Sequence, residues 1–170
     1  LTGIPSIVYG LFGYLAFVIY FGFGFSFLAG ALTLAIMVLP LILRNTQEAI
    51  KAVPILYKEA SFGLGAGRLR TIFVIILPCA ISGILAGVIL SVGRIVGESA
   101  ALLYTAGTVA QVADIGDSGR TLSVHMYALL SEGQYMEQAY ATAVILLIIV
   151  IGINFVSNML ARYLDPNKLK

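Results

Sequence analysis

The chain has 170 residues, of which 60% are hydrophobic and only 11% are charged, and its formal net charge is +2. A soluble domain carries roughly 25% charged residues, so this composition indicates an integral membrane protein and excludes a nucleic-acid-binding protein, which needs a dense basic face. One cysteine, Cys79, and one histidine, His125, exclude an intrachain disulfide, a cysteine metal cluster and a histidine-rich metal site. We therefore expect an all-α, polytopic bundle of transmembrane helices with neither a metal nor a cofactor.

Two apolar runs open the chain, and each is close to the roughly 20 residues that a helix needs to cross the hydrocarbon core of a bilayer. They lie at about 5–25, which is rich in glycine and aromatic residues, and at about 27–43. Both should be helical, because lipid offers no partner to an unpaired backbone group. The chain begins at Leu1 without a signal-peptide pattern, and we expect a fragment whose N-terminal part is missing.

The segment 44–78 comes next, and it carries half of the ten basic residues: Arg44, Lys51, Lys58, Arg68 and Arg70. An excess of basic residues marks cytoplasmic loops, so we expect this loop in the cytoplasm. Pro54 should break a helix that extends from the second apolar run. Residues 55–64 can then form a short helix, followed by a glycine-rich turn and a second helix over 68–76 that is expected to stop near Pro78.

Within this loop, Glu59-Ala60-Ser61 is followed by Gly65, six residues after the glutamate, and by Leu77-Pro78, eighteen and nineteen residues after it. An incidental helix in a basic loop would explain the charges but not this spacing. The spacing resembles the EAA loop of ABC importer permeases, with Ser61 in place of the second alanine. In that family the loop forms a short helix that docks into a separate ATPase. The resemblance therefore implies an ATPase-coupling site formed by Glu59, Ala60, Ser61, Gly65, Leu77 and Pro78.

The glycines at 63, 65 and 67 do not form a nucleotide site of their own. A Walker A loop ends in Gly-Lys-Ser or Gly-Lys-Thr and follows a buried strand, and both features are missing here. We therefore expect that the chain does not hydrolyse ATP by itself.

A third apolar run lies within 71–103 and is too long for one simple span, so we place its membrane-crossing part at about 79–99. Arg94 and Glu98 fall inside it, four residues apart, which would put them on one helix face. Charged residues at this depth cost about 2.5–3.5 kcal/mol on insertion scales, so they pair with each other or line an aqueous cavity. Two interpretations stay open: a pair that only fixes packing, or an anion pathway in which Arg94 attracts the substrate and Glu98 tempers its charge.

The segment 104–137 has one basic residue, Arg120, against four acidic residues, which favours the outer side of the membrane. It contains a turn cluster at 114–119 and a short helix expected over 125–131. The last apolar run, about 139–160, is followed by Arg162 and two lysines, so the C-terminus is expected in the cytoplasm.

Three stretches make the resemblance more specific. Residues 93–103 read Gly-Arg-Ile-Val-Gly-Glu-Ser-Ala-Ala-Leu-Leu, residues 3–13 read Gly-Ile-Pro-Ser-Ile-Val-Tyr-Gly-Leu-Phe-Gly, and residues 43–48 read Leu-Arg-Asn-Thr-Gln-Glu. Together they resemble the PstA-type permeases of phosphate ABC importers, in order and over essentially the whole chain. The resemblance implies the four C-terminal helices of a six-helix, MetI-like membrane subunit.

The same resemblance implies a substrate pathway and partners. Transport-critical charged positions of the family fall on Arg94 and Glu98, and a charged position near the cytoplasmic end falls on Arg44. Ser99 replaces a threonine and keeps its hydroxyl, and Ala101 replaces a proline. The substrate pathway that the resemblance implies therefore comprises Arg94, Glu98, Ser99 and Arg44. Family membership implies a paralogous permease as heterodimer partner, two ATP-binding cassette ATPases and an extracytoplasmic phosphate-binding protein. The subunit would lie in the cytoplasmic membrane of a bacterium or archaeon and would itself be no enzyme.

Other functions stay open at this point. The same architecture could carry another oxyanion, such as molybdate, sulfate or phosphonate. An ion-gradient-driven secondary transporter would need repeats with broken helices and intramembrane acids, of which only Glu98 is available. A membrane scaffold that transports nothing would tolerate neutralisation of Arg94 and Glu98 together.

Overall fold

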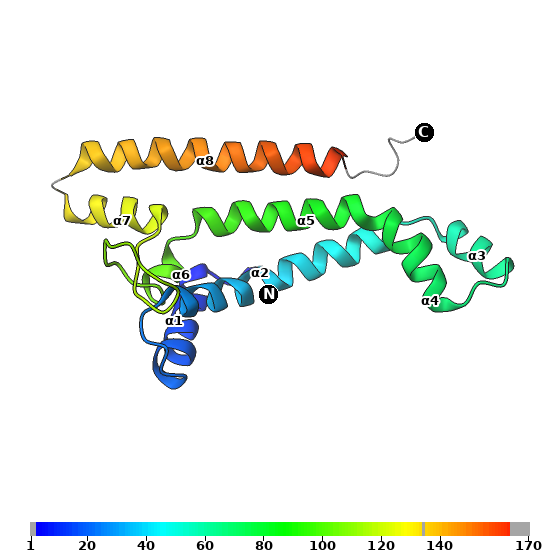
Figure 1. The fold of residues 1–170 in the computed structure, drawn as a ribbon, viewed down its shortest axis with the longest axis horizontal. Coiled ribbons are helices and arrows are strands. Elements are labelled where there is room, and N and C mark those ends of the chain that lie inside the picture. The colour runs from blue at the N-terminus through cyan, green and yellow to red at the C-terminus, as the bar shows by residue number, and fades with distance from the viewer. Residues whose placement is uncertain (1–2, 134, 164–170) are drawn as a thin grey trace. The chain divides into compact units, whose positions relative to one another are not determined.

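The computed structural model describes residues 3–133 and 135–163, the last four of these as backbone only. Within these residues every regular element is helical, which confirms the predicted all-α class (Figure 1). In chain order the elements are α1 (Ser6–Gly13), η1 (Tyr14–Tyr20), α2 (Phe27–Lys51), α3 (Ile55–Gly63), α4 (Arg68–Thr71), η2 (Ile72–Ile76), α5 (Leu77–Gly97), α6 (Ala100–Leu103), α7 (Leu122–Glu132) and α8 (Met136–Tyr163).

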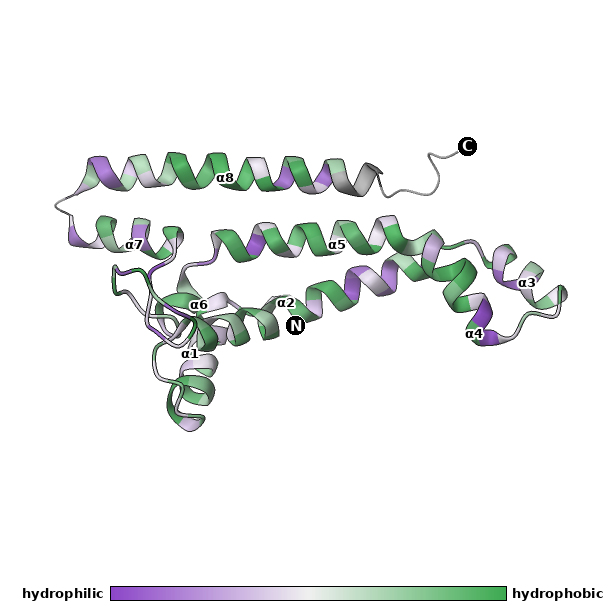
Figure 2. Ribbon diagram, in the orientation of Figure 1, coloured by the Kyte–Doolittle hydropathy of each residue, from purple (hydrophilic) through white to green (hydrophobic). Residues whose placement is uncertain are grey.

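Three of the described helices are long and apolar enough to cross a membrane. They are Phe27–Lys51, Arg68–Gly97 and Met136–Met159, and Figure 2 shows apolar residues along most of α5 and α8. The first predicted span, 5–25, holds a shorter apolar helix, Ser6–Tyr20. This helix ends before two glycines with positive φ, Gly22 at +71° and Gly24 at +63°, a backbone conformation that a helix does not accommodate.

The helix Arg68–Gly97 runs through Pro78, so the expected stop near this proline is wrong. A proline in a helix lacks an amide hydrogen and its ring crowds the carbonyl four residues earlier. Here the five residues just before Leu77 form a π-helical stretch, η2, in which hydrogen bonds span five residues instead of four. The wider turn accommodates the proline, and the helix continues without a break.

The chain forms two compact units. One comprises Leu1–Pro40 and Gly93–Ile153, and the other comprises Leu41–Val92 and Asn154–Lys170. The first unit contains the contact between α1 and α6. The second contains α3, α4 and η2, which contact one another.

Small residues let the helices of the first unit approach closely. A Cβ atom on Gly10 of α1 would lie 2.9 Å from the Cα of Ala101 in α6, and one on Gly30 of α2 would lie 3.1 Å from the Cβ of Ala106. Both alanines are fully buried. Close backbone approach of this kind is how membrane helices gain packing energy where no hydrophobic effect acts between them.

The start of α2 is held by a segment that is distant in sequence. The amides of Phe27 and Leu28 donate to the carbonyls of Asp117 (3.1 Å) and Ile115 (3.0 Å), and the hydroxyl of Ser26 accepts from the amide of Ala29. The first amides of a helix have no partner within the helix, so these bonds provide what the helix lacks.

Candidate functional site

The loop predicted to couple to an ATPase forms a helix, a tight turn and the start of a second helix. Helix α2 ends at Lys51 and α3 begins at Ile55, with Pro54 immediately before it in an extended conformation. The expected break at Pro54 is therefore present. A proline with this geometry suits the position before a helix, because the missing amide hydrogen would have no helical partner there.

The end of α3 is closed by Gly65. The amide of Ala66 donates to the carbonyl of Ser61 (3.1 Å), the amide of Gly65 donates to that of Phe62 (2.9 Å), and Gly65 has a φ of +81°. These two bonds around a left-handed residue constitute a Schellman motif, which satisfies carbonyls at the end of a helix. The backbone conformation thus explains why the EAA pattern has a glycine here, because any other residue would be strained at this φ.

A buried side-chain hydrogen bond joins the two arms of the loop. The hydroxyls of Ser61 in α3 and Thr71 in α4 lie 2.8 Å apart. Their residues are 4% and 1% exposed, although most of their neighbours in the loop are exposed. Thr71 was not among the predicted site residues, because nothing in its local sequence indicates a partner ten residues away.

The apolar surface of α3 consists of exposed large side chains on the helix and of Leu64, the residue that follows it. Ile55, Leu56 and Leu64 are among the most exposed large side chains of the chain, and Leu64 is 90% exposed. The predicted site residues Glu59 and Ala60 are exposed as well. Exposed apolar side chains grouped on one short helix are typical of a protein–protein interface.

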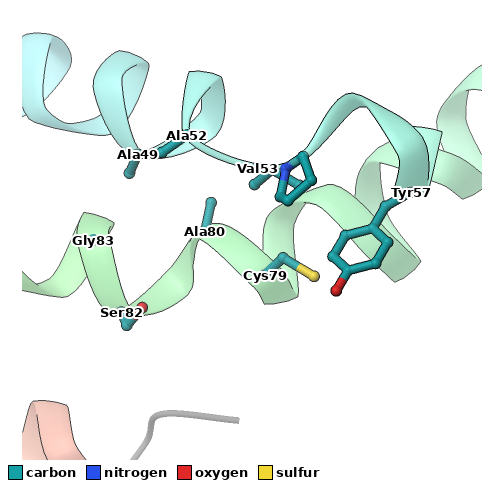
Figure 3. Close-up of a pocket in the computed structure, with 9 residues that line it drawn as sticks. Ala49, Ala52, Val53, Tyr57, Cys79, Ala80, Ser82 and Gly83 are labelled. Carbon is teal, nitrogen blue, oxygen red and sulfur yellow. The ribbon is translucent and has the colours of Figure 1, made fainter. Parts of the chain in front are cut away.

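A cavity of about 340 Å³ lies at the base of this loop (Figure 3). It is lined by Ala49, Ala52, Val53, Pro54, Tyr57, Cys79, Ala80, Ser82 and Gly83. At one end the thiol of Cys79 points toward the ring of Tyr57. Elsewhere α2 and α5 approach so closely that a Cβ atom on Gly83 would lie 2.6 Å from the Cβ of Ala49. Leu77 and Pro78 of the predicted coupling site lie in α5 just before Cys79, the first residue of this helix that lines the cavity.

The predicted charged pair is separated by the end of a helix. Helix α5 ends at Gly97, so Glu98 lies beyond it and does not share a helix face with Arg94. Arg94 is exposed, whereas Glu98 is only 9% exposed. No ion pair joins the two in the part of the chain that the structure describes.

Glu98 instead holds the junction of three helices. Its carboxylate accepts a hydrogen bond from the amide of Ala101 in α6 (3.2 Å), and its carbonyl accepts one from the hydroxyl of Ser123 in α7 (2.5 Å). Ser99, which precedes α6, makes no side-chain cap bond. The carboxylate thus takes the capping position that a serine often fills, and it fixes the backbone where α5 ends.

Arg44, the fourth residue predicted for the substrate pathway, belongs to the other compact unit. Its guanidinium lies 3.0 Å from the carboxylate of Glu48, one turn along α2, and the two side chains are 64% and 62% exposed. An exposed pair of this kind contributes only about 0.3–0.5 kcal/mol to a helix. The structure therefore gives Arg44 a surface ion pair within one helix.

Comparison with known proteins gives the family. All residues from 1 to 170 match the binding-protein-dependent transport system inner membrane components. The chain belongs to this family. It is therefore a multi-pass protein of the inner membrane, in keeping with its three long apolar helices.

Individual relatives make the family assignment more specific. The chain is 48% identical over 107 residues to the probable ABC transporter permease protein YqgI of Bacillus subtilis. It is 46% identical over 107 residues to the phosphate transport system permease protein PstA 2 of Mycobacterium tuberculosis. Each of these matches covers 63% of this chain and 36% of the relative. It is 35% identical over 158 residues to the PstA protein of Mycobacterium leprae, covering 91% of this chain and 52% of that protein. The chain thus spans about a third to a half of these relatives. The matches confirm the predicted resemblance to PstA-type permeases.

No solved structure matches the chain. Sequence reasoning located α3 and its turn. It missed Thr71 and Ser123, whose hydroxyls bond to residues ten and 25 positions away.

The Schellman motif of this permease predicts a difference between two neighbouring glycines. Gly65→Ala should destabilise the turn by about 1 kcal/mol, because alanine is strained at positive φ, and should raise hydrogen exchange of the Ala66 amide about fivefold. Gly63→Ala is the matched control, since a Cβ atom meets nothing within 4 Å at either position and Gly63 has a helical φ. Equal exchange in the two variants would contradict the assigned role of Gly65.

The helix junction at Glu98 predicts a difference in stability between variants of Glu98 and Ser99. Glu98→Ala should lower the free energy of unfolding of the full-length permease in detergent by about 1–3 kcal/mol, because the buried amide of Ala101 loses its acceptor. Glu98→Gln keeps an acceptor oxygen and should unfold close to wild type. Ser99→Ala should have little effect, since the Ser99 hydroxyl makes no cap bond. Thermal unfolding measures all three, and a loss in Ser99→Ala as large as in Glu98→Ala would refute the capping role.

Proposed function

We propose that this permease subunit belongs to an ATP-driven importer that carries inorganic phosphate into the cytoplasm. The observation that carries the proposal is similarity over 91% of the chain to a phosphate transport system permease protein, joined to an exposed apolar helix in the EAA loop. In this proposal that loop and the C-terminus lie in the cytoplasm and segment 104–137 lies outside, which the distribution of basic residues along the chain supports.

Arg94 is the residue best suited to attract the substrate. It lies in the last turn of α5, its side chain is exposed, and the rest of that turn is apolar or glycine. A guanidinium binds phosphate through two parallel hydrogen bonds and stays charged under all conditions in a protein. The carboxylate of Glu98 bonds to the Ala101 amide, so in this proposal it shapes the end of the pathway and leaves Arg94 available to the anion.

One helix links the two ends of this proposed mechanism. Arg68–Gly97 begins beside the EAA loop and contains Arg94 near its other end. Closure of two ATPase subunits would push α3, and this helix would carry the motion toward the substrate pathway. Each nucleotide state then biases the permease between two conformations, one open to the outside and one open to the inside.

The proposal implies several partners. An extracytoplasmic binding protein delivers phosphate to the outer side, two ATP-binding cassette ATPases bind the EAA loop, and a paralogous permease completes the pore. Many large apolar side chains of α8 are exposed in this chain, including Ile148 and Phe155. Lipid, further helices of the full-length subunit and the second permease would cover them.

The proposal predicts that one charge controls uptake. In vesicles that contain the full-length permease and its partners, Arg94→Gln should lower uptake of radiolabelled phosphate at least tenfold, because the anion loses its cationic partner. Lys51→Gln, which removes an exposed positive charge at the end of α2, should leave uptake near wild type.

Competing anions decide the substrate in the same assay. Excess unlabelled phosphate should abolish the signal, whereas molybdate and sulfate should not. Uptake that is unchanged in Arg94→Gln would make this arginine a packing residue, and competition by molybdate or sulfate would contradict the assignment of phosphate.

A further inference from the structure

We infer that the Ser61–Thr71 hydrogen bond makes α3 and α4 move as one body, so that Ser61 and Thr71 are positioning residues for energy coupling. The inference rests on the proposed function. Ser61 stands where the EAA pattern has an alanine, so the pair is a feature of this chain and not of the motif.

Ser61 and Thr71 are both buried, although most of the loop residues between them are exposed. Leu64 and Leu69, which lie between the two hydroxyl residues in sequence, are 90% and 72% exposed. Thr71 is nevertheless among the largest fully buried side chains of the described chain. Burial shields the bond from competing water, which is what a small polar contact needs if it is to hold two helices together.

The direction of the bonds follows from counting protons. The hydroxyl of Thr71 donates to the carbonyl of Gly67 at 3.1 Å, and a hydroxyl has one hydrogen to donate. The bond between the two side chains must then run from the Ser61 hydroxyl to the Thr71 oxygen. Ser61, Thr71 and Gly67 form an ordered chain that links the last turn of α3 to the first residue before α4.

This chain bypasses the flexible part of the loop. Between the helices lies a turn that contains Gly65 and Gly67, which have the most conformational freedom of any residue type. The Schellman bonds of Gly65 and Ala66 end on α3 itself and do not reach α4. Without the Ser61–Thr71 bond, a displacement of α3 would be absorbed by rotation within this turn.

The bond also sets where bending takes place. Thr71 is the last residue before the π-helical stretch Ile72–Ile76, and Pro78 follows that stretch. Such stretches are local weak points of a helix and often occur at functional positions. Held together by the bond, α3, the turn and α4 form the body that the ATPase pushes, and any bending falls in the helix after Thr71, which carries the motion on.

The test compares Thr71→Val with Thr71→Ser in the assembled importer. Full-length permease with its partner subunits is reconstituted in proteoliposomes, and phosphate uptake and ATP hydrolysis are measured in the same vesicles. Thr71→Val is close in volume but has no acceptor, so the phosphate imported per ATP hydrolysed should fall at least fivefold. Thr71→Ser retains the hydroxyl and should keep the wild-type ratio.

Thr142→Val is the matched control. Thr142 is also buried, and its hydroxyl also donates to the carbonyl four residues earlier, that of Gln138 at 2.8 Å, but it makes no bond to another helix. Its ratio should stay at the wild-type value. An unchanged ratio in Thr71→Val, or an equal fall in Thr142→Val, would overturn the inference.

Two further measurements distinguish a failure of this inference from a failure of the proposed function. Wild-type vesicles that neither import phosphate nor show ATP hydrolysis stimulated by the binding protein would refute the proposed function itself. If Thr71→Val does not assemble, Ser61→Ala serves instead, because it leaves the Thr71–Gly67 bond intact. Hydrogen exchange of the purified permease should then rise at least threefold in α3 and the turn, and exchange equal to wild type would overturn the inference.

Discussion

A backbone amide or carbonyl that is shielded from water must find its partner within the protein, and this requirement explains what the chain does where α3 and α5 end. At Gly97 the chain leaves α5. The carboxylate of Glu98 then accepts from the amide of Ala101 at the start of α6, and the hydroxyl of Ser123 donates to the carbonyl of Glu98. At Gly65 the chain leaves α3, and a Schellman motif closes the helix. The two residues that the EAA and Gly-Arg-x-x-Gly-Glu patterns mark most clearly, Gly65 and Glu98, are thus helix-end residues first.

This observation changes what Arg94 and Glu98 can do. Spacing alone suggests a pair on one helix face, and a pair would neutralise Arg94. Because α5 ends between them, the glutamate is held by backbone groups and the arginine is exposed. A fixed acid that shapes a junction beside an exposed base suits an anion pathway better than a closed ion pair does, since the anion needs a cation that is not already satisfied.

The sequence was sufficient for features that depend on neighbouring residues. The break at Pro54, the short helix after it and the glycine turn follow from local conformational preferences, and the structure has all three. Features that depend on distant contacts could not be predicted. The carbonyl of Glu98, just beyond the end of α5, accepts a hydrogen bond from Ser123, which lies 25 residues later. The partner of Ser61 likewise lies across a turn.

The central claim is that the apolar surface of α3 binds an ATPase subunit, and cross-linking tests it most directly. In a cysteine-free version of the full-length subunit, which includes Cys79→Ser, Leu64→Cys on this surface is compared with Val112→Cys, another highly exposed position, in segment 104–137. In membranes that contain the assembled importer, the account predicts a cross-link to the ATPase from position 64 and none from position 112. A cross-link from position 112, or none from position 64 in an importer that still hydrolyses ATP, would contradict it.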